Sequence, residues 1–204
     1  MSKLQTNTIQ HTANGSAVYT LPQTDGSAGQ VLQTNGSGVL SWVTLPSGGL
    51  SVAQQFRQTG TTATNNSTNY FTSGWEKADG TAQNGFGSFA DPSSGIFTFP
   101  TPGFYLVTFQ SYFEDAGFDP NCQVKIQATT DNSSYSTIST VNFGTTNDNS
   151  GYNYGTGFVT SIVDVTDVTQ VKVRFAVFSS ASVSWDGSNS QNRTVATFLR
   201  LGDT

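Results

Sequence analysis

From residue 52 to the C-terminus, apolar and aromatic residues alternate with polar ones, and turn-forming residues recur at intervals of one strand length. Residues 104–113 are an example, with Tyr105, Val107 and Phe109 at alternate positions. A period of two places alternate side chains on opposite faces of a strand, so that one face can be buried. A series of such strands separated by turns predicts a β-sandwich.

Composition favours the same fold class. Charged residues make up 10% of the chain and aromatic residues 12%, and residues of high helix propensity are scarce. Phe, Tyr, Val and Thr suit pleated surfaces, so we predict an all-β protein. Strands are expected at Ile96–Phe99, Phe104–Phe113, Cys122–Thr129, Tyr135–Phe143, Gly157–Val163, Val171–Phe178 and Thr194–Leu201.

Residues 1–50 have a different pattern. A short unit recurs in them, first as Gln23–Ser27 and then as Gln33–Ser37, and each copy contains Asp-Gly or Asn-Gly. These dipeptides favour tight turns with positive φ. The apolar runs beside them are too short to form a core within one chain, whereas the roughly 150 residues that follow can hold one. The segment is therefore either disordered or ordered by neighbouring copies of itself, and the second alternative describes a fibre.

The start of the second part contains a recognisable motif. Residues Asp91–Tyr105 read Asp-Pro-x-x-Gly-x-Phe-Thr followed by Pro-Gly-x-Tyr, and this resembles the signature of the C1q/tumour-necrosis-factor (TNF) family. Residues Val195–Leu201 resemble the last strand of that family, and Asp164–Val168 resemble the turn before its penultimate strand. The resemblance implies a C1q/TNF-like jelly-roll sandwich that assembles as a homotrimer.

The first part resembles a different group of proteins. Residues Thr20–Trp42 are similar to the short Gly-rich repeats of phage fibre and virion-surface proteins, which also implies a trimer. We therefore expect residues 1–50 to form an extended β arm for trimerisation and attachment, and residues 51–204 to form a jelly-roll knob. The arm residues expected to be buried between chains are Leu21, Val31, Leu32, Leu40 and Trp42.

The composition offers little for catalysis. His11 is the only histidine and Cys122 the only cysteine, so the second part contains no Ser-His or Cys-His pair. Its aspartates lie beside turn residues, where the carboxylate usually bonds its own backbone. The carboxylates around Asp115 and Asp119 lack the spacing of an EF-hand loop. We expect no enzymatic activity, no cofactor and no metal site, while a cation on a trimer axis stays open.

Charge and hydropathy narrow the range of partners. The net charge is −5 and the eight Lys and Arg residues are scattered, which argues against nucleic acid. No apolar stretch approaches the roughly 18–20 residues of a membrane span, so membrane insertion is not expected. Residues Met1–Thr6 lack the apolar run of a signal peptide, so classical secretion is not expected either.

Four aromatic residues are expected in loops rich in Gly, Asn, Ser and Asp. Counting alternating strands back from the C-terminus places loops 114–121, 144–156 and 179–193 together at the distal end of the knob. Aromatic side chains beside polar ones in such loops suit recognition, including stacking on sugars. The alternative is that each ring folds back over its own loop. The receptor-binding candidates are Phe118, Tyr152, Tyr154 and Trp185.

These expectations combine into one function. The sequence predicts a phage virion structural protein, made in the host cytoplasm and displayed on the virion surface as a homotrimeric tail fibre or knob. The arm would contact other virion proteins, and the knob would bind a glycan or protein of the host surface. One alternative is a capsid decoration protein that stabilises or ornaments the head. Others are a secreted C1q-like lectin or ligand and a carbohydrate-degrading enzyme.

Overall fold

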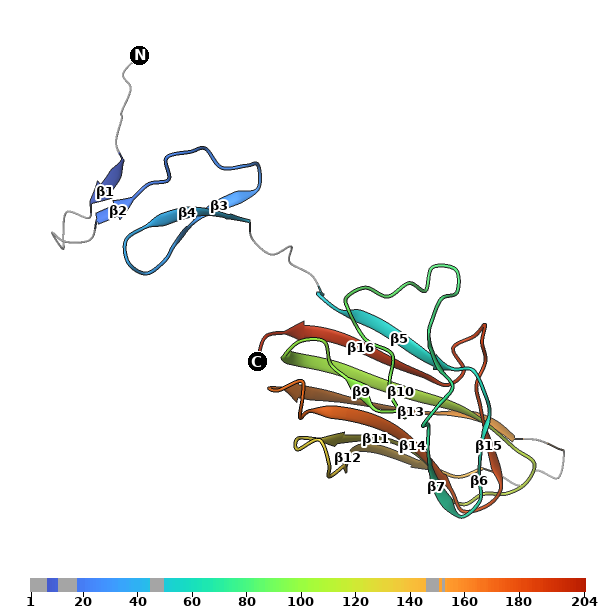
Figure 1. The fold of residues 1–204 in the computed structure, drawn as a ribbon. Helices are drawn as coiled ribbons and strands as arrows, with labels where there is room; N and C mark the ends of the chain where they lie inside the picture. The colour runs from blue at the N-terminus through green and yellow to red at the C-terminus, as the bar shows by residue number, and fades with distance from the viewer. Residues whose placement is uncertain (1–6, 11–17, 45–49, 146–150, 152) are drawn as a thin grey trace. The chain divides into compact units, whose positions relative to one another are not determined.

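The computed structural model describes residues 7–10, 18–44, 50–145, 151 and 153–204 (Figure 1). Every helix or strand assigned within these residues is a β-strand, as the sequence predicts. The chain divides into two compact units, Met1–Gly49 and Leu50–Thr204.

The first unit consists of two antiparallel hairpins, β1 with β2 and β3 with β4, whose bounds are Thr8–Gln10, Val18–Thr20, Gln30–Thr34 and Leu40–Thr44. The amide of Thr20 donates to the carbonyl of Gly38 at 2.8 Å and joins the hairpins. None of the described residues of this unit is buried. A lone two-stranded hairpin is at best marginally stable in water.

The second repeat of the first unit forms its turn as the Asn-Gly dipeptide predicts. The side-chain oxygen of Asn35 accepts hydrogen bonds from the amides of Ser37 and Val39 at 2.9 and 3.2 Å. Gly36 has a φ of 80° and Gly38 a φ of 84°, which side chains with a Cβ rarely adopt. The repeat therefore encodes a local hairpin turn.

The second unit consists of two packed sheets (Figure 1). The long sheet has seven strands: β5 (Ala53–Gln58), β6 (Thr62–Thr64), β8 (Trp75–Lys77), β10 (Gly103–Asp115), β13 (Asn153–Val165), β15 (Val183–Asp186) and β16 (Val195–Gly202). The short sheet has five: β7 (Ser67–Tyr70), β9 (Phe97–Thr98), β11 (Cys122–Thr129), β12 (Ser136–Phe143) and β14 (Lys172–Ser179).

Strand β10 is the centre of the long sheet. It pairs along its whole length with β13 on one side. On its other side it pairs first with β16 and then, near its end, with β15. Strand β5 adds to the far side of β16, and β8 adds to β5. The side chains of β10 alternate between buried and partly or fully exposed, so one face of the long sheet lines the core and the other forms its outer face.

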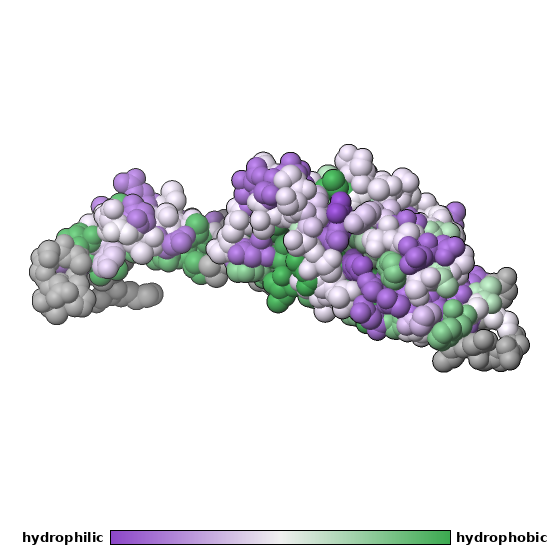
Figure 2. Space-filling model, turned by 90° about the horizontal axis from the view of Figure 1, so that it is seen from below, coloured by the Kyte–Doolittle hydropathy of each residue, from purple (hydrophilic) through white to green (hydrophobic). Residues whose placement is uncertain are grey.

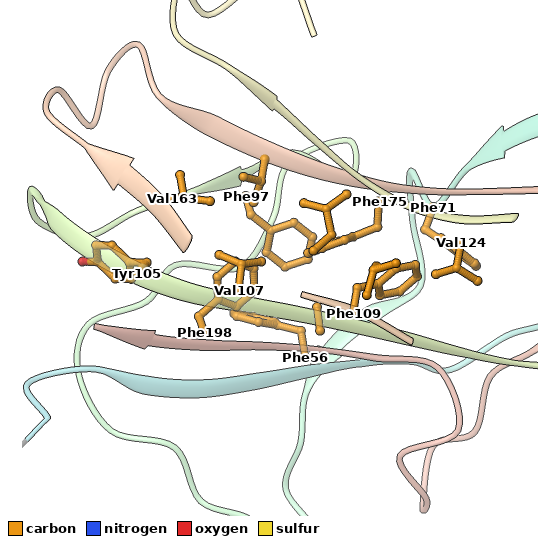
Figure 3. Close-up of a cluster of buried hydrophobic side chains, with 14 of the residues drawn as sticks. Phe56, Phe71, Phe97, Tyr105, Val107, Phe109, Val124, Val163, Phe175 and Phe198 are labelled. Atoms are coloured by element: carbon orange, nitrogen blue, oxygen red, sulfur yellow. The ribbon is translucent and has the colours of Figure 1, made fainter. Parts of the chain in front are cut away.

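The core is an aromatic cluster between the sheets (Figure 3). The ring of Phe97 lies 5.2 Å from Phe56, 5.2 Å from Phe175 and 5.1 Å from Phe198, measured between ring centroids. Aromatic pairs of this kind add about 0.5–1.5 kcal/mol beyond the area that they bury. The strand residues of alternating pattern are buried as expected: Phe97, Phe99, Tyr105, Val107, Phe109, Phe175 and Phe198.

The glycine of the sequence motif has a steric reason. Gly95 lies in a tight turn in which Ser93 and Ile96 exchange backbone hydrogen bonds of 3.2 and 2.9 Å. Its φ is 74°, and a Cβ built on it would clash with the carbonyl oxygen of Phe71 and lie 2.8 Å from Cα of Thr72. Only glycine fits this position, and the turn leads directly into β9.

Candidate functional site

The connections between strands meet at the end of the second unit that is opposite its first residues. The amide of Arg200 donates to the carbonyl of Val52 at 3.0 Å, which marks the proximal end, where the unit begins and β16 finishes. At the distal end the amide of Thr145 donates to the carbonyl of Asp119 at 2.8 Å, and that of Ser180 donates to Asn121 at 3.1 Å. The loops after β10 and β14 and the first residues after β12 therefore lie together, as expected from the count of strands.

Asp119 holds these loops in place. It is buried, and its carboxylate accepts hydrogen bonds from the Ser180 hydroxyl at 2.5 Å, the Ala181 amide at 2.8 Å and the Asn121 amide at 2.8 Å. Burial by itself raises the pKa of Asp119, but the bonds from Ser180, Asn121 and Ala181 lower the pKa below its usual value. The ionised carboxylate is thus used to fix the loops.

The neighbouring Asp115 is also occupied by loop contacts. Its carboxylate accepts from the Thr145 hydroxyl at 2.8 Å and from the Gly117 amide at 3.0 Å. The described residues contain no group of three or more His, Cys, Asp or Glu side chains placed to hold a metal ion. The carboxylates of Asp115 and Asp119 therefore hold the loops together through hydrogen bonds.

Two of the four receptor-binding candidates are exposed at the distal end. Phe118 has 54% of its surface exposed and Tyr154 has 58%. The side chain of Asn153 donates to the carbonyl of Gly117 at 2.8 Å and so brings their segments together. Tyr154 is the second residue of β13, although a loop was expected there. Tyr152 lies outside the described residues.

The expectation for Trp185 was wrong. Residues 183–186 form strand β15, and the alternation of Val183 and Trp185 turns both side chains toward the core. Trp185 is 0% exposed, its ring lies 5.7 Å from that of Phe113, and its indole Nε1 donates to Oγ1 of Thr64 at 2.8 Å. Trp185 is therefore a core residue and cannot contact a receptor.

Three residues that the sequence pattern did not indicate complete the distal surface. The ring of Tyr112 stacks on Tyr154 with centroids 6.3 Å apart, and the guanidinium of Arg193 lies 5.4 Å from the centre of the Tyr112 ring. Arg193 also pairs with Asp186 at 3.2 Å. We call Tyr154, Tyr112, Arg193 and Asp186 the distal row. Because Tyr112 follows Tyr105, Val107 and Phe109 with the opposite parity, the alternation alone would have placed it on the outer face.

The distal row offers stacking and charge together. A hollow of about 410 Å³ lies next to it and is lined by Ala63, Glu114, Ala116 and residues 182–184. Glu114 is directly opposite Tyr154 in the pairing of β10 with β13. Aromatic faces with an adjacent cation and carboxylates suit a ligand with ring faces and hydroxyl groups.

The outer face of the long sheet has large apolar side chains exposed. The register aligns Ile162 with Leu106 and Leu199 in one row across β13, β10 and β16. Ile162 is 63% exposed, and Phe158, two rows further along β13, is 54% exposed. The row between them consists of Thr160, Thr108 and Thr197. Exposed apolar rows on a sheet mark a surface for protein contact.

The predicted arm residues have different environments. Val31 and Leu32 are exposed, whereas Leu21, Leu40 and Trp42 are half-buried. The indole Nε1 of Trp42 donates to the carbonyl of Thr24 at 2.8 Å, and the ring packs against Gly26. The unit also exposes the large apolar residues Ile9, Val18, Tyr19 and Val39. Contacts of this arm with other chains stay a prediction.

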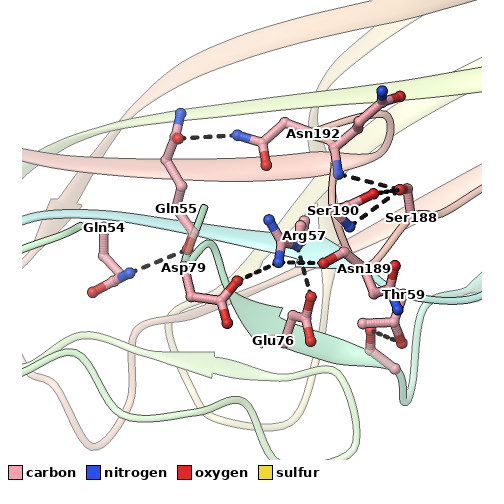
Figure 4. A network of polar contacts seen from close by, with 12 residues as sticks. Gln54, Gln55, Arg57, Thr59, Glu76, Asp79, Ser188, Asn189, Ser190 and Asn192 are labelled. Atoms are coloured by element: carbon pink, nitrogen blue, oxygen red, sulfur yellow. Dashed lines mark hydrogen bonds and ion pairs between the residues drawn. The ribbon is translucent and has the colours of Figure 1, made fainter. Parts of the chain in front are cut away.

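A buried arginine connects three segments at the side of the long sheet (Figure 4). Arg57 of β5 donates to Glu76 at 2.7 Å, to Asp79, and to the carbonyl of Asn189 at 2.5 Å. The hydrogen bond to Glu76 is the largest cause that raises the pKa of Arg57, so the guanidinium stays charged. Its role is structural, because its bonds hold residues 76–79 and 188–190 against β5.

Cys122 is buried in the core. Burial is the main cause that raises the pKa of its thiol to about 12, and the nearby carboxylate of Asp119 adds to the rise. A thiol in this state is protonated and is a poor nucleophile. No helix in the described residues is long and apolar enough to cross a membrane.

Comparisons with known proteins identify the fold. No family model and no curated protein matches the chain. The solved structures that resemble it include Eiger TNF from S. frugiperda, with a TM-score of 0.55 and 16% identity over 76% of this chain and 96% of that one. Murine APRIL at pH 8.5 matches with a TM-score of 0.51 and 12% identity over 74% of this chain and 98% of that one. At these identities the likeness concerns the fold, so the chain contains a jelly roll of the TNF type.

Proposed function

We propose that this protein is a homotrimeric fibre or knob on the surface of a phage virion, where it binds the host surface. The observation that carries the proposal is that the first unit consists of hairpins without a single buried residue among those described. Such a unit gains stability only when its apolar side chains contact other chains. The first unit therefore has a role in assembly. Because its repeat resembles the repeats of phage fibres, we take the assembly to be a virion fibre.

The outer face of the long sheet supports a trimer of the second unit. Ile162 and Phe158 lie on β13, the edge strand beside β10, and expose apolar surface. The threonine row between them adds short side chains that permit close approach of another chain. Three copies that pack through these faces would remove Ile162, Leu106 and Phe158 from water.

The distal row is the surface that we assign to the host. It lies at the end of the second unit away from Val52, where the chain enters the unit. A trimer would present three copies of Tyr154, Tyr112 and Arg193 in one direction. Three weak sites on one knob gain avidity through effective concentration, without any single tight site. Binding, rather than chemistry, is the mechanism of this proposal.

The proposal is tested with the full chain and a chain of residues 50–204. Light scattering is expected to give trimer mass for the full chain, and the shorter chain is expected to fold because the core lies within it. Purified phage particles labelled with an antibody against the knob should carry the label on their surface. A monomeric full chain in concentrated solution, an unfolded shorter chain, or particles without label would contradict the proposal.

The position of the label separates the candidates within the virion class. Label at the tail indicates a fibre, and label over the head indicates a capsid decoration protein. The likeness to Eiger TNF and murine APRIL favours a second candidate, a soluble C1q-like or TNF-like ligand. That candidate predicts free trimers in the culture medium and no label on particles.

A further inference from the structure

The outer surface of the short sheet is positively charged in an acidic protein. It carries Lys125 on β11 and Lys172 and Arg174 on β14, three of the eight Lys and Arg residues of the chain. The five strands of this sheet contain no Asp or Glu. None of the three cations has an ion pair with a carboxylate in the part of the chain that the structure describes. We call this surface the cationic face.

Arg174 is fixed in one position on the cationic face. Its guanidinium carbon lies 4.2 Å from the ring centre of Tyr70 and 4.2 Å from that of Tyr135. Its Nε donates to the side-chain oxygen of Gln127 at 2.8 Å. The two terminal Nη groups make no hydrogen bond to the described residues, and neither is enclosed. The stacked guanidinium is therefore held ready to donate to an anion from outside the chain.

The neighbours of Arg174 also lack partners for their polar groups. The Tyr135 hydroxyl is a buried atom without a hydrogen-bond partner among the described residues. The ammonium of Lys125 lies 5.5 Å from the ring centre of Phe178, and burial lowers its pKa. An anion that approached this face would meet the cations Arg174 and Lys125, neither of which has an ion pair with a carboxylate of the described residues.

Between the cations, the surface consists of side-chain amide and hydroxyl groups. The strand register places Gln127 beside both Arg174 and Thr137, and Lys125 beside Thr140. Gln123 and Asn142 continue the next row. Figure 2 shows the molecule from below the view of Figure 1, where β7 and β12 lie, and strongly hydrophilic residues are mixed there with weakly polar and hydrophobic ones. Such side chains can bond the hydroxyl groups of a sugar chain.

We propose that the cationic face binds an acidic polysaccharide, with a carboxylate of a uronic acid on Arg174 and further carboxylates near Lys125 and Lys172. The ring of Tyr70, which is 39% exposed, supplies apolar contact area for a sugar ring beside Arg174. The planar fork of a guanidinium matches a carboxylate with two parallel hydrogen bonds. This inference stands apart from the virion proposal and from the distal row, since it concerns the opposite sheet of the same knob.

Other anionic partners fit the face less well. A nucleic acid carries one charge about every 3.4 Å per strand, whereas the cationic face has only three cations, set among amide and hydroxyl side chains. An acidic peptide that added a strand would bind a sheet edge through its backbone, whereas the three cations stand on the face. A polysaccharide with carboxylates spaced along a hydroxylated chain matches both the charges and the amides.

The test is a calorimetric titration of the full chain with an oligogalacturonate and, separately, with its methyl ester. The oligogalacturonate is expected to bind, with an affinity that falls as salt rises, and the uncharged methyl ester is expected not to bind. Arg174→Gln should weaken binding about tenfold or more, because hydrogen bonds to charged groups are lost. Arg174→Lys keeps the positive charge but loses the planar pair of N–H donors. Its affinity should therefore lie between that of the unchanged protein and that of Arg174→Gln.

Lys77→Gln is the matched control, since it removes one positive charge from β8 in the long sheet. It should leave the affinity unchanged. Equal weakening by Lys77→Gln and Arg174→Gln, binding of the methyl ester, or tighter binding of polyglutamate or single-stranded DNA would overturn the proposal. If Arg174→Gln fails to fold, the double variant Lys125→Gln and Lys172→Gln tests the same face, and unchanged affinity in it would overturn the proposal as well.

Discussion

The indole Nε1 of Trp185 donates a hydrogen bond of 2.8 Å to Oγ1 of Thr64 inside the core. The same hydroxyl lies within hydrogen-bond reach of the hydroxyl of Ser179 on the other sheet. Thr64 therefore connects β15 of the long sheet to β14 of the short sheet. An aromatic residue that the loop composition assigns to recognition is instead part of the contact between the two sheets.

Thr64→Val should destabilise the second unit by about 1–3 kcal/mol, because it leaves the buried indole N–H without an acceptor. The free energy of unfolding in urea measures this effect. Phe118→Ala is the control, since the side chain is exposed, and its effect should stay within about 0.5 kcal/mol. Equal effects of the two substitutions would show that the hydrogen bond contributes little.

Gly95→Ala should lower stability by more than the roughly 1–3 kcal/mol that a left-handed backbone costs a residue with a Cβ. The reason is the added contact of the new Cβ with the backbone of Phe71 and Thr72. Gly60→Ala is the matched control, because a Cβ at Gly60 meets nothing within 4 Å. Thermal unfolding of the two variants provides the comparison, and similar midpoints would contradict the prediction.

Asp119→Asn should destabilise the protein at neutral pH and have less effect in acid. The pKa of Asp119 is lowered in the folded state, so its contribution to stability is present above its unfolded pKa of about 3.9 and disappears as the pH falls through the folded value. Urea unfolding at about pH 7 and about pH 3 tests this. The same change at the exposed Asp164 should give a small effect at both values, and a pH-independent loss in Asp119→Asn would refute the assignment.

Ile162→Lys should convert the proposed trimer to monomers while the second unit stays folded. The substitution places a charge in the exposed apolar row that Ile162 forms with Leu106 and Leu199. Ile138→Lys is the control, since Ile138 is also exposed but lies on β12 of the short sheet. Sedimentation equilibrium gives the mass of each variant. A trimer that survives Ile162→Lys would place the interface elsewhere.

Tyr154→Ala and Tyr112→Ala should reduce binding of the purified protein to host cells without loss of stability. Both substitutions remove a ring from the distal row. Thr166→Ala, an exposed change in the turn between β13 and β14 at the other end of the unit, should leave cell binding as it was. Flow cytometry with labelled protein measures binding, and unchanged binding in both tyrosine variants would remove the distal row from the host contact.

Alternation of apolar and polar residues was enough to predict seven strands of the sandwich, but β5, β6, β7, β8 and β15 were not predicted. Cys122–Thr129 matches β11 residue for residue, and the strands expected at Tyr135, Val171 and Thr194 each begin one residue later in the structure. Burial of one face dictates such patterns directly. The fold class and the core aromatics of the predicted strands could therefore be read from the chain.

The candidate site was harder to predict from the sequence because it depends on pairing between distant segments. Trp185 lies in a stretch rich in Ser, Gly and Asn, and only its pairing with Phe113 and Thr62 makes that stretch a strand. Phe158 and Ile162 read as ordinary strand residues, and their exposure follows from the register of β13 with β10. The sequence pattern alone does not show which face of these strands is exposed.

The charges of the second unit are divided between its sheets. The long-sheet strands carry Arg57, Lys77 and Arg200 against Glu76, Glu114, Asp115, Asp164 and Asp186, whereas the short-sheet strands carry cations alone. The strand charges by themselves would give the unit an electric dipole directed across the sandwich. Near a negatively charged surface, the short sheet would turn toward that surface before any contact forms. At low ionic strength, encounters with such a surface would therefore begin in one orientation rather than at random.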